Sequence, residues 1–125
     1  MDKNRITLIG HLGSDPTSRT IPGKEGGEEK HVTNFRFAVN SPFDDAPLWA
    51  TIECWGGLCE VVQSLNLRKG SRLYVEGKLV PDKATGGPEI WVPESGDKQG
   101  VPQATFKIWA DEIIALESRS QKAEG

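Results

Sequence analysis

The sequence has little cysteine and little histidine. It has two cysteines and two histidines in 125 residues. Two cysteines are too few for a disulfide framework, and the spacing of Cys54, Cys59, His11 and His31 matches no zinc-binding pattern. We therefore expect both cysteines to be small buried hydrophobes, and we expect no metal and no cofactor.

Catalytic motifs are missing as well. The segment GHLGSD at 10–15 lacks the Lys-Ser/Thr pair of a phosphate loop, and ATGG at 84–87 is an isolated turn signal. No Ser/His/Asp arrangement can be read with so few histidines. The sequence therefore predicts that the protein is not an enzyme.

Long apolar runs are also absent. No stretch approaches the ~20 apolar residues that a membrane helix needs. The first residues, MDKNR, lack the apolar segment of a signal peptide. We therefore expect no export signal and no membrane anchor, which favours the cytoplasm.

The composition that remains is that of a folded domain. Hydrophobic residues make up 36% of the chain and charged residues 26%, with a formal net charge of −3. The negative charge counts against a nucleic-acid binder, but fields act mainly within about 10 Å at ordinary salt. A basic face can coexist with acidic edges because the acids concentrate in loop-like stretches: Glu25, Glu28, Glu29, Asp44, Asp45, Glu94 and Asp97.

Hydrophobic periodicity and turn residues divide the chain into strands, a helix and long loops. The predicted strands cover 4–12, 32–40, 48–55, 71–80 and 104–116, and the helix runs from Leu58 to about Leu67. The predicted loops cover 21–30, 41–47 and 81–103, the last with a short apolar stretch at Ile90-Trp91-Val92 that suits a β-arm or a mobile loop. This order predicts an all-β, five-stranded OB-fold barrel at 1–116, with one helix between the third and fourth strands, a long arm between the fourth and fifth, and a polar tail at 117–125.

The alternation also predicts which side chains face the core. Along 71–80, the predicted inward residues are Leu73, Val75 and Leu79, and the predicted outward residues are Arg72, Tyr74, Glu76 and Lys78. The half-buried strand at 32–40 has Thr33, Phe35, Phe37 and Val39 on one side and Val32, Asn34, Arg36, Ala38 and Asn40 on the other. The helix has an apolar stripe of Leu58, Val61, Val62 and Leu65.

The strand at 48–55 has two chemically different faces. Ala50, Ile52 and Cys54 form an apolar face, whereas Trp49, Thr51, Glu53 and Trp55 form the other. Large aromatics on a mixed polar face suit either stacking on nucleic-acid bases or burial against a neighbouring subunit. Both interpretations remain open from the residues alone.

Four segments occur in the order and spacing of a known family. They are LIGHLGSDPTSR from Leu8 to Arg19, the segment from Trp49 to Gly56, LRKGSRLYVEGKL from Leu67 to Leu79, and ADEIIAL at 110–116. In these segments the chain resembles the bacterial and mitochondrial single-stranded-DNA-binding proteins, over roughly residues 4–80 and 104–116.

The resemblance implies binding and protection of single-stranded DNA without sequence preference, during replication, recombination and repair. It implies a homotetramer, with a dimer as the alternative, and replication and repair proteins as further partners. It implies a bacterial nucleoid location in the cytoplasm, or alternatively the mitochondrial matrix. The family's stacking aromatics fall on Trp49, Trp55 and Phe43.

Further aromatic and basic residues complete the candidate surface. Trp91 is a candidate replacement for a family tryptophan whose position holds Ala84, and Trp109 suits either stacking or a subunit contact. The candidate phosphate-binding cations are Lys3, Arg5, Arg19, Arg36, Arg72, Lys78 and Lys83.

The chain also departs from the family pattern. A family histidine at a subunit contact is Ala50 here, and family basic residues are Thr51 and Gly57. The long tail with an acidic tip is missing, which indicates either a member without that tail or a shortened chain. The alternative function is an OB-fold interaction module of a replication-restart (primosome) complex, which binds proteins as well as strands.

Overall fold

The computed structural model describes residues 1–116, so the predicted tail at 117–125 lies outside the described residues. The elements are β1 (Ile6–Leu12), β2 (Thr17–Ile21), β3 (Lys30–Val39), β4 (Leu48–Trp55), α1 (Gly57–Ser64), β5 (Arg72–Val80), β6 (Glu89–Trp91) and β7 (Gln103–Leu116). The five predicted strands are present, each within two residues of its expected bounds.

Strand pairing closes the sheet into a ring. β1 pairs antiparallel with β5, β5 with β7, and β7 runs parallel to β4. β4 then pairs with β3, and β3 pairs with the end of β1 at His11↔Ala38 and Leu12↔Phe37, which closes the ring. Together with α1 between β4 and β5, this confirms the predicted OB-fold.

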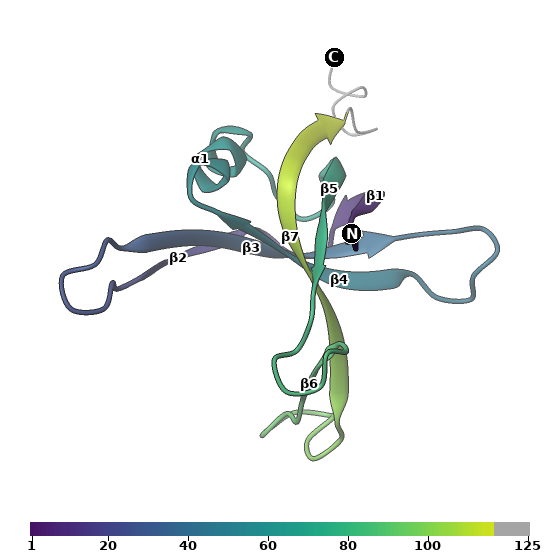
Figure 1. Cartoon of the computed structure of the whole chain (residues 1–125). Helices are drawn as coiled ribbons and strands as arrows, with labels where there is room; N and C mark the ends of the chain where they lie inside the picture. The colour runs from purple at the N-terminus through teal and green to yellow at the C-terminus, as the bar shows by residue number, and fades with distance from the viewer. Residues whose placement is uncertain (117–125) are drawn as a thin grey trace.

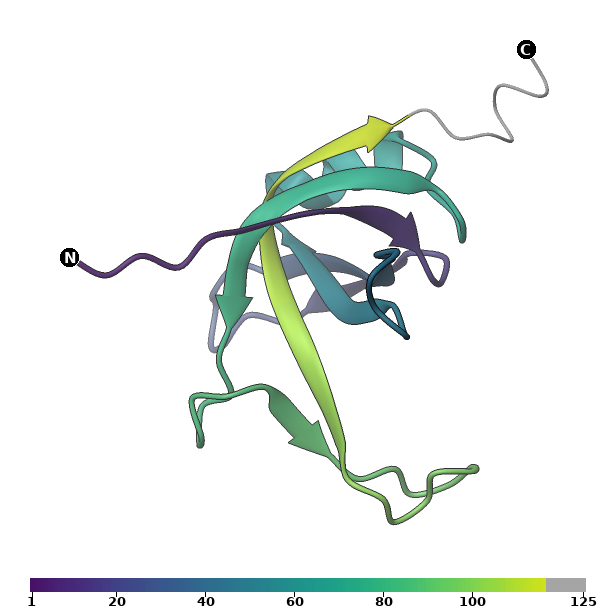
Figure 2. The same cartoon turned by 90° about the vertical axis from the view of Figure 1, so that its right-hand side faces the viewer.

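Three long connections project from the barrel in different directions (Figure 1). They are the β2–β3 hairpin, the loop between β3 and β4, and the arm that carries β6. Figure 2 shows the arm extending away from the curved strands of the barrel. The barrel therefore serves as a rigid centre from which these segments extend.

The core is formed by apolar side chains of all five barrel strands. Phe35 and Phe37 meet edge to face with ring centroids 6.1 Å apart, and Ile52, Leu73 and Ile108 are at most 1% exposed. The predicted inner face of β4, formed by Ala50, Ile52 and Cys54, is fully buried. Alternation along β4 was therefore predicted correctly.

Both cysteines are buried, as predicted. Cys59 lies on the buried side of α1, where its Sγ is 2.7 Å from the Thr33 hydroxyl. Burial, with smaller contributions from the charges of Cys59 and Glu53, raises the pKa of Cys54 to about 12. Both residues act as small core side chains, and Cys54 stays a thiol at neutral pH.

The helix is shorter than predicted and its buried face differs. It ends at Ser64 rather than near Leu67, and Val61, which the pattern placed on the core face, is 44% exposed. Cys59 and Val62 are the buried residues instead. A helix of eight residues covers one end of a barrel with a narrow stripe, so one flank of its apolar face remains in solvent.

One other prediction of orientation was wrong. Leu79 is 40% exposed although its alternation is inward, because it lies beyond the core beside the base of the arm. On β3, residues of both sides of the alternation are buried, since Val32 and Ala38 are as inaccessible as Phe35 and Phe37. Val32 lies in register between the long side chains of Arg19 and Trp55, and Ala38 pairs with Trp49, so large neighbours cover two small residues.

Two short strands lengthen the connections. Thr17–Ile21 forms β2 against β3, so the predicted loop at 21–30 is the tip of a hairpin. In the arm, β6 pairs with β7 at Glu89↔Thr105, Ile90↔Ala104 and Trp91↔Gln103, which makes it a β-arm.

In the described part of the chain, no helix has the length and apolar character needed to cross a membrane.

We predict that Gly10→Ala lowers the free energy of unfolding by about 1–3 kcal/mol. A Cβ on Gly10 would collide with the backbone carbonyl of Ala38, at the crossing where β1 meets β3 and the ring closes. Gly57→Ala is the matched control, because a Cβ there meets nothing within 4 Å at the start of the helix. Urea unfolding of both variants checks the prediction, and equal free energies of unfolding would contradict it.

Candidate nucleic-acid interface

The outer face of β4 continues across its neighbouring strands. Glu53 is in register with Asn34 of β3 on one side and with Trp109 of β7 on the other, and Trp109 pairs in turn with Lys78 of β5. Directly paired residues project to the same side of a sheet. Residues far apart in sequence therefore form one row across the outer surface of the barrel.

Trp55 and Trp109 form a close pair in this surface. Their ring centroids are 6.0 Å apart and their planes are tilted by 60°. The Nε1–H groups of both indoles donate to the same atom, Glu53 Oε1, at 3.4 Å from Trp55 and 2.8 Å from Trp109. One carboxylate oxygen thus fixes the edges of both rings.

Glu53 is also connected to the arm through a lysine. Glu53 is 6% exposed. Its Oε2 lies 3.9 Å from Lys107 Nζ, and the same Nζ lies 2.8 Å from Glu89 Oε2 on β6. The hydrogen bond with Glu89 raises the pKa of Lys107. Desolvation lowers this pKa, whereas the negative charge of Glu53 raises it further, and the net shift is upward. Lys107 therefore stays protonated and links the barrel face to the arm.

Trp49 lies at the other end of β4 with a cation on its ring. The Arg36 guanidinium carbon is 4.8 Å from the ring centroid, which is cation–π geometry. The far edge of the indole lies against Gly13, where a Cβ would collide with it. Trp49 remains 42% exposed, so part of its ring surface is free.

The two remaining aromatic candidates lie on the projecting segments. Phe43 is 93% exposed in the loop between β3 and β4. Trp91 is 46% exposed on β6, and its Nε1–H donates to the Thr105 hydroxyl at 2.9 Å. These two rings are therefore not part of the row on the barrel itself.

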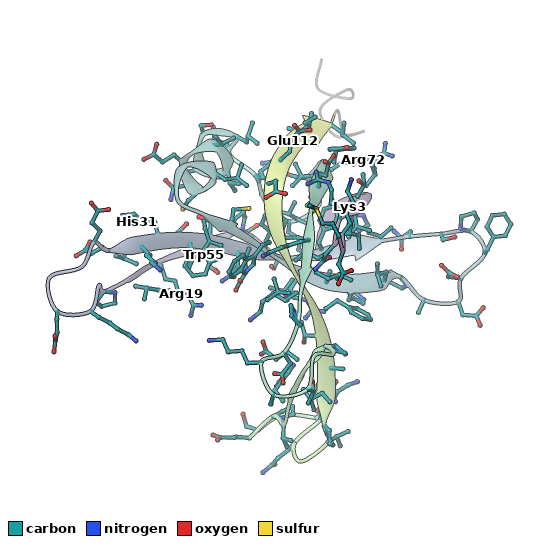
Figure 3. The ribbon with its side chains drawn as sticks, in the orientation of Figure 1. Lys3, Arg19, His31, Trp55, Arg72 and Glu112 are labelled. Carbon is teal, nitrogen blue, oxygen red and sulfur yellow. The ribbon has the colours of Figure 1, made fainter. Side chains whose placement is uncertain are left out.

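The structure separates the predicted cations into two groups. Lys78 Nζ lies 4.8 Å from the Trp109 ring centroid, Arg36 covers Trp49, and Arg19 shares a register row with Trp55. Figure 3 shows Arg19 and His31 on the β2–β3 hairpin and Trp55, the last residue of β4, beside it.

The second group lies elsewhere. Arg5 is held by Glu76 of β5 and Asp111 of β7. Arg72 and Lys3 lie on the side of β1 and β5, away from Trp55 (Figure 3), and Lys83 is exposed in the turn after β5. The structure therefore brings Arg19, Arg36 and Lys78 to the tryptophans and leaves the other four apart.

An open groove of about 650 Å³ lies between the paired indoles and the β2–β3 hairpin. Its walls are Trp55 and Trp109 on one side and Ile21, Lys30 and His31 on the other. This size is within the ~300–1,000 Å³ of small-ligand pockets. The groove gives the surface a recess beside its two rings.

Sequence reasoning missed Glu53 and Lys107 as parts of this surface. Alternation placed Glu53 between two tryptophans, which was a signal, since a carboxylate on such a face needs a partner. Lys107 gave no such signal because its partners come from β4 and β6.

Within residues 1–116, no group of three or more His, Cys, Asp or Glu side chains could hold a metal ion.

Comparisons with known proteins identify the family of the chain. The profile described as "Single-strand binding protein family" matches residues 3–87. "Single-stranded DNA-binding protein 1" of Chlorobaculum tepidum is 36% identical over 83 residues, which cover 61% of this chain and 48% of that protein. The "Single-stranded DNA-binding protein" of Neisseria meningitidis serogroup A is 28% identical over 132 residues, with 100% and 66% coverage.

The chain thus spans about half to two thirds of the length of these curated relatives. A solved structure of the second single-stranded DNA-binding protein of Mycobacterium smegmatis superposes with a TM-score of 0.60 at 20% identity, covering 94% of this chain and 97% of that one. At this identity the likeness supports the fold alone.

We predict that Gly13→Ala displaces the Trp49 ring without unfolding the protein. The ring can turn into solvent because it is already 42% exposed, so the free energy of unfolding should fall by no more than about 1 kcal/mol. Near-ultraviolet circular dichroism should report the displaced indole. Gly87→Ala is the control, since its nearest contact would be the Thr85 hydroxyl at 3.7 Å. An unchanged spectrum in the Gly13 variant would contradict the contact.

Proposed function

Because the chain belongs to the single-strand binding protein family, we propose that it binds single-stranded DNA without sequence preference, by stacking bases on exposed rings and neutralising phosphates. The observation that carries this proposal is the pair of indoles, Trp55 and Trp109, on an outer sheet face with Lys78 beside them. Stacking on an aromatic ring contributes ~1–3 kcal/mol per base and tolerates every base.

Trp49 supplies a second stacking position on the same strand. It is six residues from Trp55, which corresponds to roughly 20 Å along a β-strand. Different bases of one strand can therefore occupy the two positions. Phe43 and Trp91, on segments that project from the barrel, are further candidates for bases that leave its surface.

The charges near these rings suit a phosphate backbone despite the net charge of −3. Lys78 and Arg36 each lie 4.8 Å from an indole centroid, and Arg19 is in the adjoining row. A cation beside a stacking ring can meet the phosphate of the base that the ring holds. Local charge, rather than the total, therefore favours an anionic strand.

We propose that the protein has no catalytic role and acts during DNA replication, recombination and repair in the bacterial cytoplasm, with other proteins of those processes as partners. The resemblance to the family supports this wider role, and the relatives named above come from the bacteria Chlorobaculum tepidum and Neisseria meningitidis.

We also propose self-association, as a homotetramer or alternatively a dimer. Ile9, Tyr74 and Ile114 form a register row on the outer face of β1, β5 and β7, and both isoleucines are 47% exposed. Exposed apolar rows of this kind are usual at interfaces between copies of a chain. This surface is separate from the row that contains Trp55.

We predict that an oligonucleotide quenches the tryptophan fluorescence strongly, and that Trp49→Ala and Trp55→Ala each cost about 1–3 kcal/mol of affinity. The fold should persist in both variants because neither ring belongs to the core cluster. Fluorescence titration and light scattering on the same variants provide the measurement.

Two outcomes would count against this assignment. Variants with unchanged mass that bind as tightly as the parent would refute the stacking role of both residues. Micromolar or weaker binding by the parent at physiological salt would instead favour the protein-interaction module.

We predict a stable oligomer without DNA, and we expect Ile114→Glu to reduce its mass because a carboxylate in an apolar contact costs several kcal/mol. Ile90→Glu is the control: Ile90 is 60% exposed on the arm, away from the Ile9–Tyr74–Ile114 row. Light scattering at micromolar concentration checks both variants. A parent with the mass of a single chain would contradict self-association.

A further inference from the structure

On its indole side, the groove is lined by aromatic carbon rather than by hydrogen-bonding groups. Both Nε1–H groups point to Glu53, which is buried and does not line the groove. The donors of the two rings are therefore already used, and the surfaces left for the groove are ring carbons. Such a wall can stack on a ligand but offers it no indole hydrogen bond.

The tilt between the rings determines what shape fits. With planes at 60° and centroids 6.0 Å apart, a flat ring lying on one indole meets the edge of the other. Offset-stacked and edge-to-face contacts are both favourable for aromatic systems. A planar aromatic ligand can thus make one contact of each kind at the same time.

The hairpin side of the groove carries one cation and one carboxylate, Lys30 and Glu29. On the indole side, Lys78 Nζ lies over the Trp109 ring, 4.8 Å from its centroid. The apolar recess can take a flat ring, and Lys30 and Lys78 are the cations available to the phosphates that flank it.

We propose that Glu53 is a positioning residue, which keeps the indole wall of this groove in the orientation that a stacked base requires. This inference rests on the proposed function and adds to it the residue that orders the stacking surface. Glu53 itself does not touch the base. It acts by fixing the orientation of Trp55 and Trp109 through one shared oxygen.

Glu53 can be replaced without leaving a buried charge alone. Lys107 keeps its 2.8 Å contact with Glu89 when Glu53 is absent. The Lys107 side chain is also 29% exposed, so removal of Glu53 does not leave a buried, unpaired cation, the case in which breaking an ion pair is strongly destabilising. The two indoles would lose their common acceptor, however, and Trp109, 39% exposed, would be free to turn.

The test compares Glu53→Leu, Glu53→Gln and the control Glu112→Gln, which removes one carboxylate from the exposed outer face near the end of β7. Glu53→Leu should bind an oligothymidylate at least about fivefold more weakly, the loss expected from one poorly stacked base. It should also lose the exciton-coupled circular dichroism band of the paired indoles. Glu53→Gln should retain both properties because its amide oxygen still accepts, and Glu112→Gln should match the parent.

An abasic strand of the same length separates positioning from a general structural effect. Phosphate contacts do not depend on the indoles, so the parent and Glu53→Leu should bind the abasic strand equally. If Glu53→Leu does not fold, Glu53→Met takes its place. Failure of both apolar variants to fold would overturn the positioning role, because Glu53 would then be required by the fold.

The remaining outcomes distinguish this inference from the proposed function. A parent that binds neither strand would overturn the proposed function and the positioning role together. A parent that binds the oligothymidylate, with a folded Glu53→Leu variant that binds it equally well, would overturn the positioning role and leave the proposed function standing.

Discussion

The register of β4 between β3 and β7 is the constraint on which this surface depends. Alternation along β4 sends Ala50, Ile52 and Cys54 into the core and leaves Glu53 and Trp55 on the outside. Parallel pairing with β7 then sets Trp109 directly beside Glu53. A shift of one residue would exchange the faces and bury the indoles in place of the core residues. Folding of the barrel and assembly of the surface are therefore one event.

A carboxylate in the middle of a surface proposed for an anion has a physical explanation. Glu53 is buried, and its charge is compensated by two indole donors and by Lys107, so little of it is exposed to an approaching phosphate. Hydrogen-bond donors around a carboxylate stabilise it where an unpaired one would be costly. Glu53 therefore orders the neutral stacking surface, while separate cations, such as Lys78 and Arg36, remain beside the rings.

The sequence was sufficient for the order of the elements and for the two faces of β4, because both depend on local period and turn residues. It did not reveal β2 or the Trp55–Trp109 pair, since each depends on pairing between strands. Trp55 and Trp109 are brought together by a parallel register that no local pattern encodes. Val61 and Leu79 were misplaced for a related reason: periodicity indicates a direction, whereas burial depends on where the barrel ends.

The surface combines a fixed centre with exposed outer aromatics, and this division affects how a strand would bind. The indoles of Trp55 and Trp109 are held before any ligand arrives, so a base placed there requires little ordering of side chains. Phe43 and Trp91 lie on projecting segments, where a contact with a base must offset the entropy lost in fixing them. Affinity should thus arise mainly at the barrel, and the projecting segments should mainly determine how much additional strand is covered.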